Sequence, residues 1–201
     1  MKDFWNARYA EATYAYGKTP NNFFAGELVA RLPGRLLLPC EGEGRNAVYA
    51  AALGWEVRAF DLAEAGRDKA LALAREAGVR IEYEVAPHAE AHLEPGWADV
   101  AALIYAHVPA DGRRDFHRRV ARGLRPGGVL LLEGFEVGQL GRDSGGPKNE
   151  AMLFDEARLR EDFAPELVID RLETTEVVLE EGRFHRGPAR VIRLVGRRAS
   201  D

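Results

Sequence analysis

The chain has 201 residues, of which 46% are hydrophobic and 30% charged, and its formal net charge is −4. This length and composition predict one globular domain with a sizeable core, and the negative charge argues against a surface that binds nucleic acid. No apolar run reaches the length that spans a membrane, and Cys40, the only cysteine, excludes an intramolecular disulfide and is typical of a reducing, cytoplasmic setting.

The segment before the first expected strand is predicted to be helical over residues 1–16 and 23–32, with a loop between them. Its first part is rich in aromatic side chains, which include Trp5 and Tyr16. Two interpretations fit such a segment. It is either a helix that covers one edge of the core or a cap whose rings cover a bound ligand.

Residues 35–52 predict a strand, a tight turn and a helix. Three successive leucines form a strand that is buried on both faces. Gly42 and Gly44 in the turn permit positive φ and let a ligand approach the backbone closely. The small residues from Asn46 onward predict a helix that packs tightly on the sheet, and its first N–H groups face whatever lies over the turn.

A second strand, over residues 56–60, ends in Asp61, nineteen positions after Gly42. A carboxylate at this place accepts hydrogen bonds from both hydroxyls of a ribose. The glycine turn and Asp61 together therefore predict a ligand that contains adenosine. The alternative is a strand-to-helix turn that binds nothing.

The rest of the chain continues the alternation of helices and strands. Further helices are expected over 65–77, 111–124 and 155–163, and further strands over 79–85, 98–106, 129–133, 168–180 and 188–197. Loop 87–96 contains His88 and His92, but no cysteine or third histidine joins them at ligand spacing, so we expect a solvated loop and no metal.

This order predicts an α/β fold with a doubly wound, mostly parallel sheet of seven strands and helices on both faces. The last two strands are expected to form an antiparallel pair at its edge. Right-handed crossovers bring Gly42, Asp61 and His107, which follows the fourth strand, to one carboxyl edge.

The glycine turn, Asp61, the turn at 126–128 and the closing strand pair together resemble the class I S-adenosylmethionine-dependent methyltransferases, which have a Rossmann-like fold. The resemblance covers essentially the whole chain. Segments 16–21, 41–46 and 145–147 look like the small tellurite-resistance-type and thiopurine-type methyltransferases. In that family an N-terminal cap covers the cofactor, which implies this role for residues 1–32 of a single domain spanning 1–201.

The resemblance implies a set of residues that bind S-adenosyl-L-methionine. They come from the cap, the glycine turn and the ends of three strands: Trp5, Tyr16, Cys40, Glu41, Gly42, Gly44, Asn46, Asp61, Leu62, His88 and Tyr105. The carboxylate of the methionine end is expected at the start of the helix that follows the turn. The sequence departs from the class pattern where Cys40 replaces the first glycine and Pro87 replaces an acidic residue that contacts adenine.

The expected reaction is methyl transfer to a small molecule that offers a thiol, a chalcogen oxyanion or an amine. His107 is the candidate catalytic residue, as proton acceptor or orienter, and the alternative is a structural histidine at a loop start. The sequence at 105–109 lacks the Asn/Asp-Pro-Pro-aromatic motif of enzymes that methylate base nitrogens. An NAD-type oxidoreductase and a protein that binds the cofactor without turnover are the alternative functions.

Overall fold

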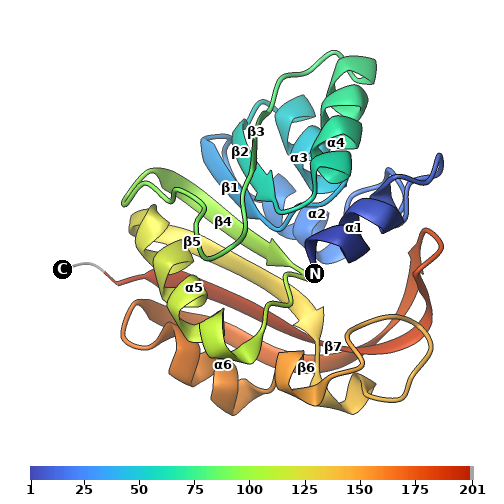
Figure 1. The fold of residues 1–201 in the computed structure, drawn as a ribbon. Helices are drawn as coiled ribbons and strands as arrows, with labels where there is room; N and C mark the ends of the chain where they lie inside the picture. The colour runs from blue at the N-terminus through green and yellow to red at the C-terminus, as the bar shows by residue number, and fades with distance from the viewer. Residues whose placement is uncertain (200–201) are drawn as a thin grey trace.

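The computed structural model describes residues 1–199, whose elements form a sheet between two layers of helices (Figure 1). The helices are α1 (Lys2–Tyr9), α2 (Asn22–Val29), α3 (Arg45–Ala52), α4 (Glu64–Glu76), α5 (Ala110–Gly123) and α6 (Glu156–Phe163). The strands are β1 (Arg35–Pro39), β2 (Glu56–Asp61), β3 (Glu82–Val85), β4 (Ala98–Ile104), β5 (Leu124–Phe135), β6 (Leu167–Glu181) and β7 (His185–Arg198). Two short 3₁₀ turns, η1 (Val137–Gln139) and η2 (Glu150–Met152), lie between β5 and α6.

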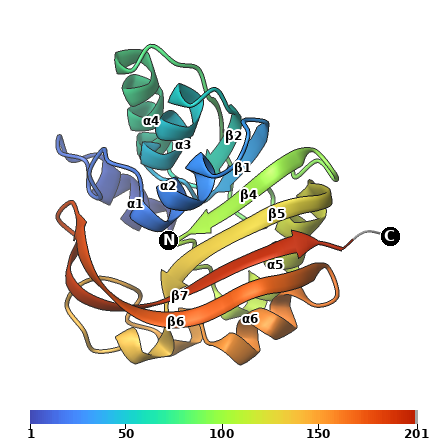
Figure 2. The same ribbon diagram turned by 180° about the vertical axis from the view of Figure 1, so that it is seen from behind.

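The seven strands form one sheet in the order β3-β2-β1-β4-β5-β7-β6. Neighbouring strands from β3 to β5 are parallel, whereas β7 runs antiparallel to both β5 and β6. The predicted doubly wound sheet with its closing antiparallel pair is therefore confirmed. The long hairpin of β6 and β7 forms one edge of the sheet, beside β5 (Figure 2).

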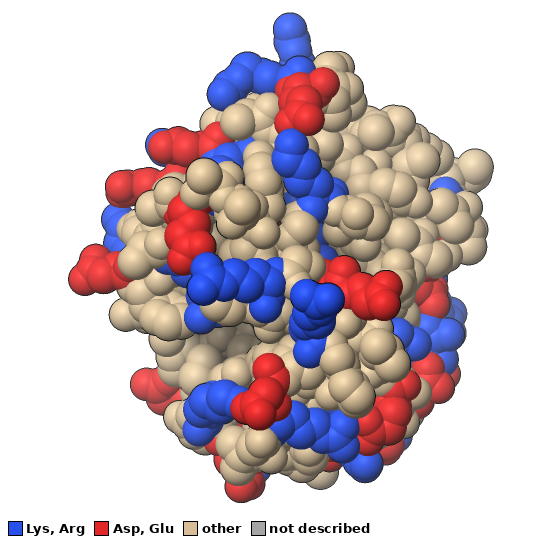
Figure 3. Space-filling model, turned by 90° about the vertical axis from the view of Figure 1, so that its right-hand side faces the viewer, with Lys and Arg blue, Asp and Glu red and all other residues tan. Residues whose placement is uncertain are grey.

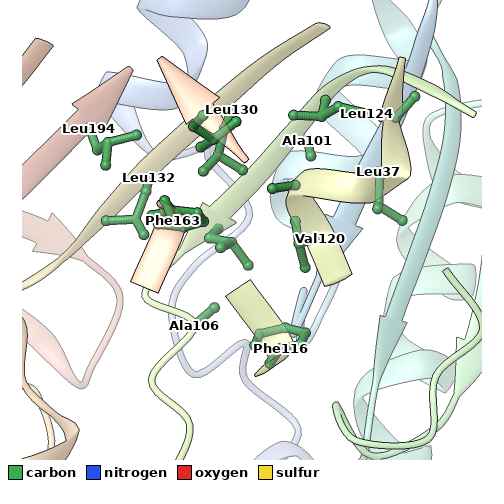
Figure 4. Packing of buried hydrophobic residues seen from close by; sticks show 14 of the residues in the cluster. Leu37, Ala101, Ala106, Phe116, Val120, Leu124, Leu130, Leu132, Phe163 and Leu194 are labelled. Carbon is green, nitrogen blue, oxygen red and sulfur yellow. The ribbon is translucent and has the colours of Figure 1, made fainter. Parts of the chain in front are cut away.

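The core lies on both faces of the sheet, which explains the continuous leucine run of β1. Leu37 packs on the side of α5 and α6, together with Val120, Leu132 and Phe163 (Figure 4). Leu36 and Leu38 point to the opposite face, where residues of α2 and α3 cover them. Successive side chains of a strand point to opposite faces, so a strand covered on both sides needs apolar residues at every position.

The elements that fall furthest short of their predicted lengths are α1 and β3. Helix α1 ends at Tyr9 rather than near residue 16. The residues after it are not helical, and the backbone N–H of Ala15 donates to the carboxylate of Glu43 (2.7 Å) instead of to a preceding turn of helix. Strand β3 begins at Glu82 rather than at Val79. The N–H of Val79 donates to the carbonyl of Ala74 and closes the end of α4.

The connection between β3 and β4 has no helix, in agreement with the loop predicted there. Because this stretch of the sheet is not covered by a helix, a cavity of about 590 Å³ opens beside β2 and β3, lined in part by Arg58, Tyr83 and Trp97. The hydroxyl of Tyr83 donates to the carbonyl of Gly42 (2.6 Å), so this wall of the cavity is connected to the glycine turn. Among residues 1–199, no helix is long and apolar enough to cross a membrane.

The turn between β6 and β7 docks on the segment that follows α1, so that the last hairpin meets a segment near the N-terminus (Figures 1 and 2). The N–H of Arg183 donates to the carbonyl of Ala15 (3.0 Å). A Cβ atom at Gly182 would lie 2.6 Å from this same carbonyl oxygen. We call residues 1–21 the cap and residues 181–185 the hairpin tip.

Candidate functional site

Strands β4 and β5 end toward the right-hand side of the molecule in Figure 1, and Figure 3 shows this face. Basic and acidic side chains alternate over this surface, which is hollowed between them. The glycine turn, the end of β2, the end of β4, the cap and the hairpin tip all contribute to this edge. It is therefore the place where the predicted site residues can be located one by one.

The glycine turn has the left-handed backbone that its sequence requires. Gly42 and Gly44 have φ angles of 64° and 85°. Cys40 has a φ of 56°, so this cysteine adopts the conformation for which a glycine is the usual residue. Gly44 also allows α3 and α4 to approach, because a Cβ atom there would lie 2.5 Å from the Cβ of Ala70.

Asp61 ends β2 directly beside this turn and is almost fully buried. Its carboxylate accepts hydrogen bonds from the N–H groups of Gly42 (3.2 Å) and Ala63 (2.9 Å). Burial raises the pKa of Asp61 to about 6, although these hydrogen bonds favour the charged form. In the described part of the chain no basic side chain pairs with it, so the carboxylate retains capacity to accept hydrogen bonds from a ligand.

Glu41 corrects one expectation about the helix after the turn. Its carboxylate accepts from the N–H groups of Asn46 and Ala47, both at 2.8 Å, and therefore caps the start of α3. The protein's own carboxylate takes the place that we expected for the carboxylate of a ligand. Burial raises the pKa of Glu41 to about 7 against the effect of these hydrogen bonds.

The side chain of Asn46 joins the glycine turn to the cap. Its Oδ1 accepts from the N–H of Asn21 (2.9 Å), and its Nδ2 donates to Glu41 (3.3 Å). Glu43 adds a second connection, because it accepts from the N–H of Ala15 and from Nζ of Lys69 (2.8 Å). The cap is thus fixed to the turn through buried polar groups.

The aromatic residues of the cap lie against the turn and the end of β2. Tyr9 is buried with Ala63, and Trp5 stacks on its ring at 5.4 Å between centroids. The hydroxyl of Tyr9 lies 2.8 Å from the place of a Cβ at Gly42. Tyr16 lies further along the edge, where its hydroxyl accepts from Arg8 (2.8 Å).

Leu62 and His88 lie at the far end of the edge, past β2 and β3. Leu62 follows Asp61 and is half-buried. The ring of His88 packs edge-on against Phe116 of α5 at 5.3 Å, and its carbonyl accepts from Arg119 (2.9 Å). Burial lowers the pKa of His88, so this ring is neutral near pH 7.

Tyr105 and His107 follow β4, as predicted. Tyr105 has a φ of 53°, which is strained for a tyrosine, and its hydroxyl donates to Glu133 of β5 (3.1 Å). His107 uses both ring nitrogens on backbone groups. Nδ1 bonds the carbonyl of Met152 (2.7 Å), and Nε2 accepts from the N–H of Phe135 (2.9 Å).

These bonds fix the state of the His107 ring. A carbonyl can only accept, so Nδ1 carries the proton and Nε2 is the acceptor. Burial lowers the pKa of His107 to about 4, and the ring remains neutral. This is the structural arrangement that we considered as the alternative to a catalytic role for His107.

The hairpin tip brings a second histidine to the same edge, which the sequence analysis missed. The His185 ring lies 4.5 Å from the rings of both Tyr16 and Tyr105, and 5.1 Å from that of Phe135. Its Nδ1 is 3.1 Å from the carboxylate of Glu181. Nε2 makes no hydrogen bond to any residue of 1–199. It is also not one of the side-chain nitrogens in this range that are buried without a hydrogen-bond partner, so it remains accessible to solvent.

Glu181 links this histidine to the glycine turn and to the cap. It accepts from Arg45 of α3 (2.9 Å) and from Asn21 (3.0 Å). Burial raises the pKa of Glu181, but the bond to His185 and the charge of Arg45 outweigh this and hold it at about 2. Among the described residues, no group of three or more His, Cys, Asp or Glu side chains is arranged to hold a metal ion.

Comparison with known proteins agrees with this geometry. Residues 38–128, a little under half of the chain, match the family model described as a methyltransferase domain. No curated protein sequence matches the chain. The matched segment contains the glycine turn, Asp61, His88, Tyr105 and His107, whereas the cap and the hairpin tip lie outside it.

Three solved structures share the fold at low sequence identity. One, described for the conversion of a disulfide bond into a thioacetal group during echinomycin biosynthesis, has a TM-score of 0.81 at 18% identity and covers 99% of this chain and 92% of its own. TehB from Haemophilus influenzae has a TM-score of 0.72 at 15% identity, covering 98% and 66%. The 1,6-didemethyltoxoflavin-N1-methyltransferase of Burkholderia thailandensis, solved with S-adenosylhomocysteine, has a TM-score of 0.64 at 23% identity, covering 88% and 77%.

Proposed function

We propose that this S-adenosylmethionine-dependent methyltransferase acts on a small-molecule acceptor: a thiol, a chalcogen oxyanion or an amine. The methyltransferase domain at residues 38–128 establishes the donor and the reaction class. The acceptor is inferred from one observation above all, which is the contact between the cap and the hairpin tip. It closes over the ends of β4 and β5, as expected for a small acceptor rather than a polymer.

The residues at the edge fit the donor. The buried carboxylate of Asp61, which has no basic partner, suits the two hydroxyl donors of a ribose, and the Gly42 turn gives the backbone close approach. Trp5 and Tyr9 would cover this end, while Leu62 and His88 lie where the adenine would extend. When bound, S-adenosylmethionine supplies a methyl group on a sulfonium sulfur, which is a good leaving group.

Catalysis then depends mainly on where the protein holds the acceptor. Orientation of two reactants can account for about 7–11 kcal/mol of the barrier. We assign the walls of the acceptor site to Tyr16, Tyr105 and Phe135, and its proton acceptor to His185, because Nε2 of this ring is neutral and unpartnered. Burial lowers the pKa of His185, which keeps the ring neutral.

His107 receives a different role from the one predicted. Both of its nitrogens are bonded to backbone, so the ring connects the end of β4 to Phe135 and to Met152. The segment between those two residues forms the loop beside the hairpin tip, where Gly145 approaches the His185 ring. We propose that His107 positions this loop and does not itself take a proton.

The tellurite-resistance-type and thiopurine-type methyltransferases remain the family that we propose for the chain. The helical segment of residues 1–32, which contains the cap, and the turn at 41–46 support it, as does the similar fold of TehB. On this basis soft acceptors, namely thiols and chalcogen oxyanions, are the first to test.

The experiment combines binding with turnover. Calorimetric titration with S-adenosylhomocysteine and with NADH is expected to give binding only of the former. Transfer of a labelled methyl group is then measured with thiols, selenite, tellurite and amines. Binding of S-adenosylhomocysteine without transfer to any of these would favour a protein that binds the cofactor without turnover, and tight binding of NADH alone would contradict the proposal.

A further inference from the structure

Glu181 lies where three separate parts of the chain meet. Through Oε1 it accepts from Nδ2 of Asn21 in the cap, and through Oε2 from Arg45 at the start of α3. Oε2 is also 3.1 Å from Nδ1 of His185 in the hairpin tip. Glu181 is half-buried, and the side chain of Arg45 is only 8% exposed, so solvent screens this pair weakly.

The contact between Glu181 and His185 determines which nitrogen carries the proton. A carboxylate has no hydrogen to give, so the hydrogen bond forms only when Nδ1 is protonated. The neutral ring then has its lone pair on Nε2, which is the nitrogen without a partner. In the opposite tautomer, the lone pair of Nδ1 would face the charged carboxylate, and Nε2 would present a proton to the acceptor.

We propose that Glu181 is a positioning residue for methyl transfer, which holds His185 in the tautomer that can accept a proton and fixes its ring relative to the glycine turn. This inference rests on the function proposed above. A thiol acceptor loses its proton to Nε2, its sulfur electron pair forms the bond to the methyl carbon, and the pair of the broken carbon–sulfur bond leaves with the sulfonium sulfur. An amine attacks with its own lone pair and gives its proton to Nε2 afterwards. His185 afterwards releases the proton to solvent.

The surroundings of the ring support this assignment. The charged groups that face it are Glu181, Arg45 and Arg8, and the rings of Tyr16 and Tyr105 each lie 4.5 Å from it between centroids. Arg45 alone would oppose a positive imidazolium, whereas Glu181 stabilises it by charge and by the hydrogen bond. The carboxylate thus serves the ring both before and after proton transfer, in the manner of the acidic member of a catalytic triad.

The test uses the full chain with the variants Glu181→Ala and Glu181→Gln, and Glu180→Ala as the matched control, because Glu180 is the exposed neighbour in the same strand. The tautomer of His185 is read from the ¹⁵N shifts of the ring near pH 8, with His185→Gln to assign the signal. Wild type and Glu180→Ala are expected to show Nδ1–H. Glu181→Ala is expected to shift the proton to Nε2, and Glu181→Gln, which keeps one acceptor oxygen, to lie between the two.

The kinetic arm measures methyl transfer with the best thiol or amine of the panel, because these acceptors lose a proton. Glu181→Ala is expected to lower kcat about 100-fold or more with little change in KM for S-adenosylmethionine, and Glu180→Ala to leave both unchanged. Each of three results would overturn the assignment. The first is a wild-type ring with its proton on Nε2, and the second is an unchanged tautomer in Glu181→Ala. The third is a changed tautomer in Glu181→Ala with wild-type kcat. Lack of transfer by the wild type would instead contradict the proposed function, while the tautomer still decides what Glu181 does.

Discussion

Asp61→Asn is expected to weaken the binding of S-adenosylhomocysteine and to remove its dependence on pH near pH 6. Burial gives Asp61 a pKa of about 6 in the ligand-free protein. Ribose hydroxyls donate to the ionised carboxylate, so binding favours loss of the proton and lowers this pKa further. Affinity must therefore fall as the pH falls through 6.

The size of the effect follows from the same value. At pH 5 about nine tenths of Asp61 is protonated, so affinity in the wild type should be roughly tenfold weaker than at pH 8. The asparagine variant does not titrate, and it replaces a hydrogen bond to a charged group, which is worth about 1.5–3 kcal/mol. At pH 8 this corresponds to a loss of about 10- to 150-fold.

Calorimetry between pH 5 and pH 8 measures both effects. Asp170→Asn is the control, because Asp170 lies on β6 in an exposed ion pair with Arg197. Any slope that remains in Asp61→Asn belongs to Glu41, whose pKa is about 7, and Glu41→Gln checks this. An Asp61→Asn protein with wild-type affinity and a tenfold fall at pH 5 would refute the role of Asp61.

Three further predictions concern packing. Gly44→Ala should lower the free energy of unfolding by about 2–5 kcal/mol in urea titrations, because the new Cβ clashes with Ala70 and the backbone keeps a strained positive φ. Gly78 also has a positive φ, of 69°, but open space around it, so Gly78→Ala should cost only about 1–2 kcal/mol. Equal losses in the two variants would contradict the packing argument. Gly182→Ala should release the cap, because the new Cβ would lie 2.6 Å from the carbonyl oxygen of Ala15. Amide hydrogen exchange should become faster in residues 1–21 and stay unchanged in the core. Unchanged exchange in residues 1–21 would contradict the docking of the hairpin tip on the cap. Asp162→Asn should lower the free energy of unfolding by about 3–5 kcal/mol, because Arg113 loses a buried partner at 2.6 Å. Burial raises the pKa of Asp162, but its contacts with His117 and Arg113 outweigh this and lower it, so the wild type loses this stability as the pH falls below about 4. A variant with the same acid denaturation curve would show that these contacts contribute nothing.

Local patterns in the sequence predicted the elements that we propose to hold the donor. The leucine run of β1, the glycines and Asp61 are all interpretable from neighbouring residues, because backbone conformation and strand burial decide them. The alternation of helices and strands predicted a mostly parallel sheet with an antiparallel pair at its edge, but not the order of the strands. For the same reason Cys40 was recognised as standing in a glycine position, and its φ of 56° agrees with that reading.

The contacts made by polar side chains were not predictable in this way. Glu41 sits in the turn, but that its carboxylate caps α3 depends on the path of the backbone between them. His107 was placed correctly at the edge, yet its role depends on the carbonyl of Met152, 45 positions later. His185 and Glu181 lie in a hairpin whose existence was predicted, but nothing local indicates that its tip docks on the cap.

The bond between Arg45 and Glu181 joins positions separated by 136 residues. Contacts of such separation form late, because the intervening chain must first lose its freedom. During synthesis the glycine turn and β2 emerge early, but the enclosure around them waits for the final hairpin. In a nascent chain the proposed nucleoside site would therefore remain open until β6 and β7 have been made, so the acceptor site that we propose could be completed only when this hairpin docks on the cap.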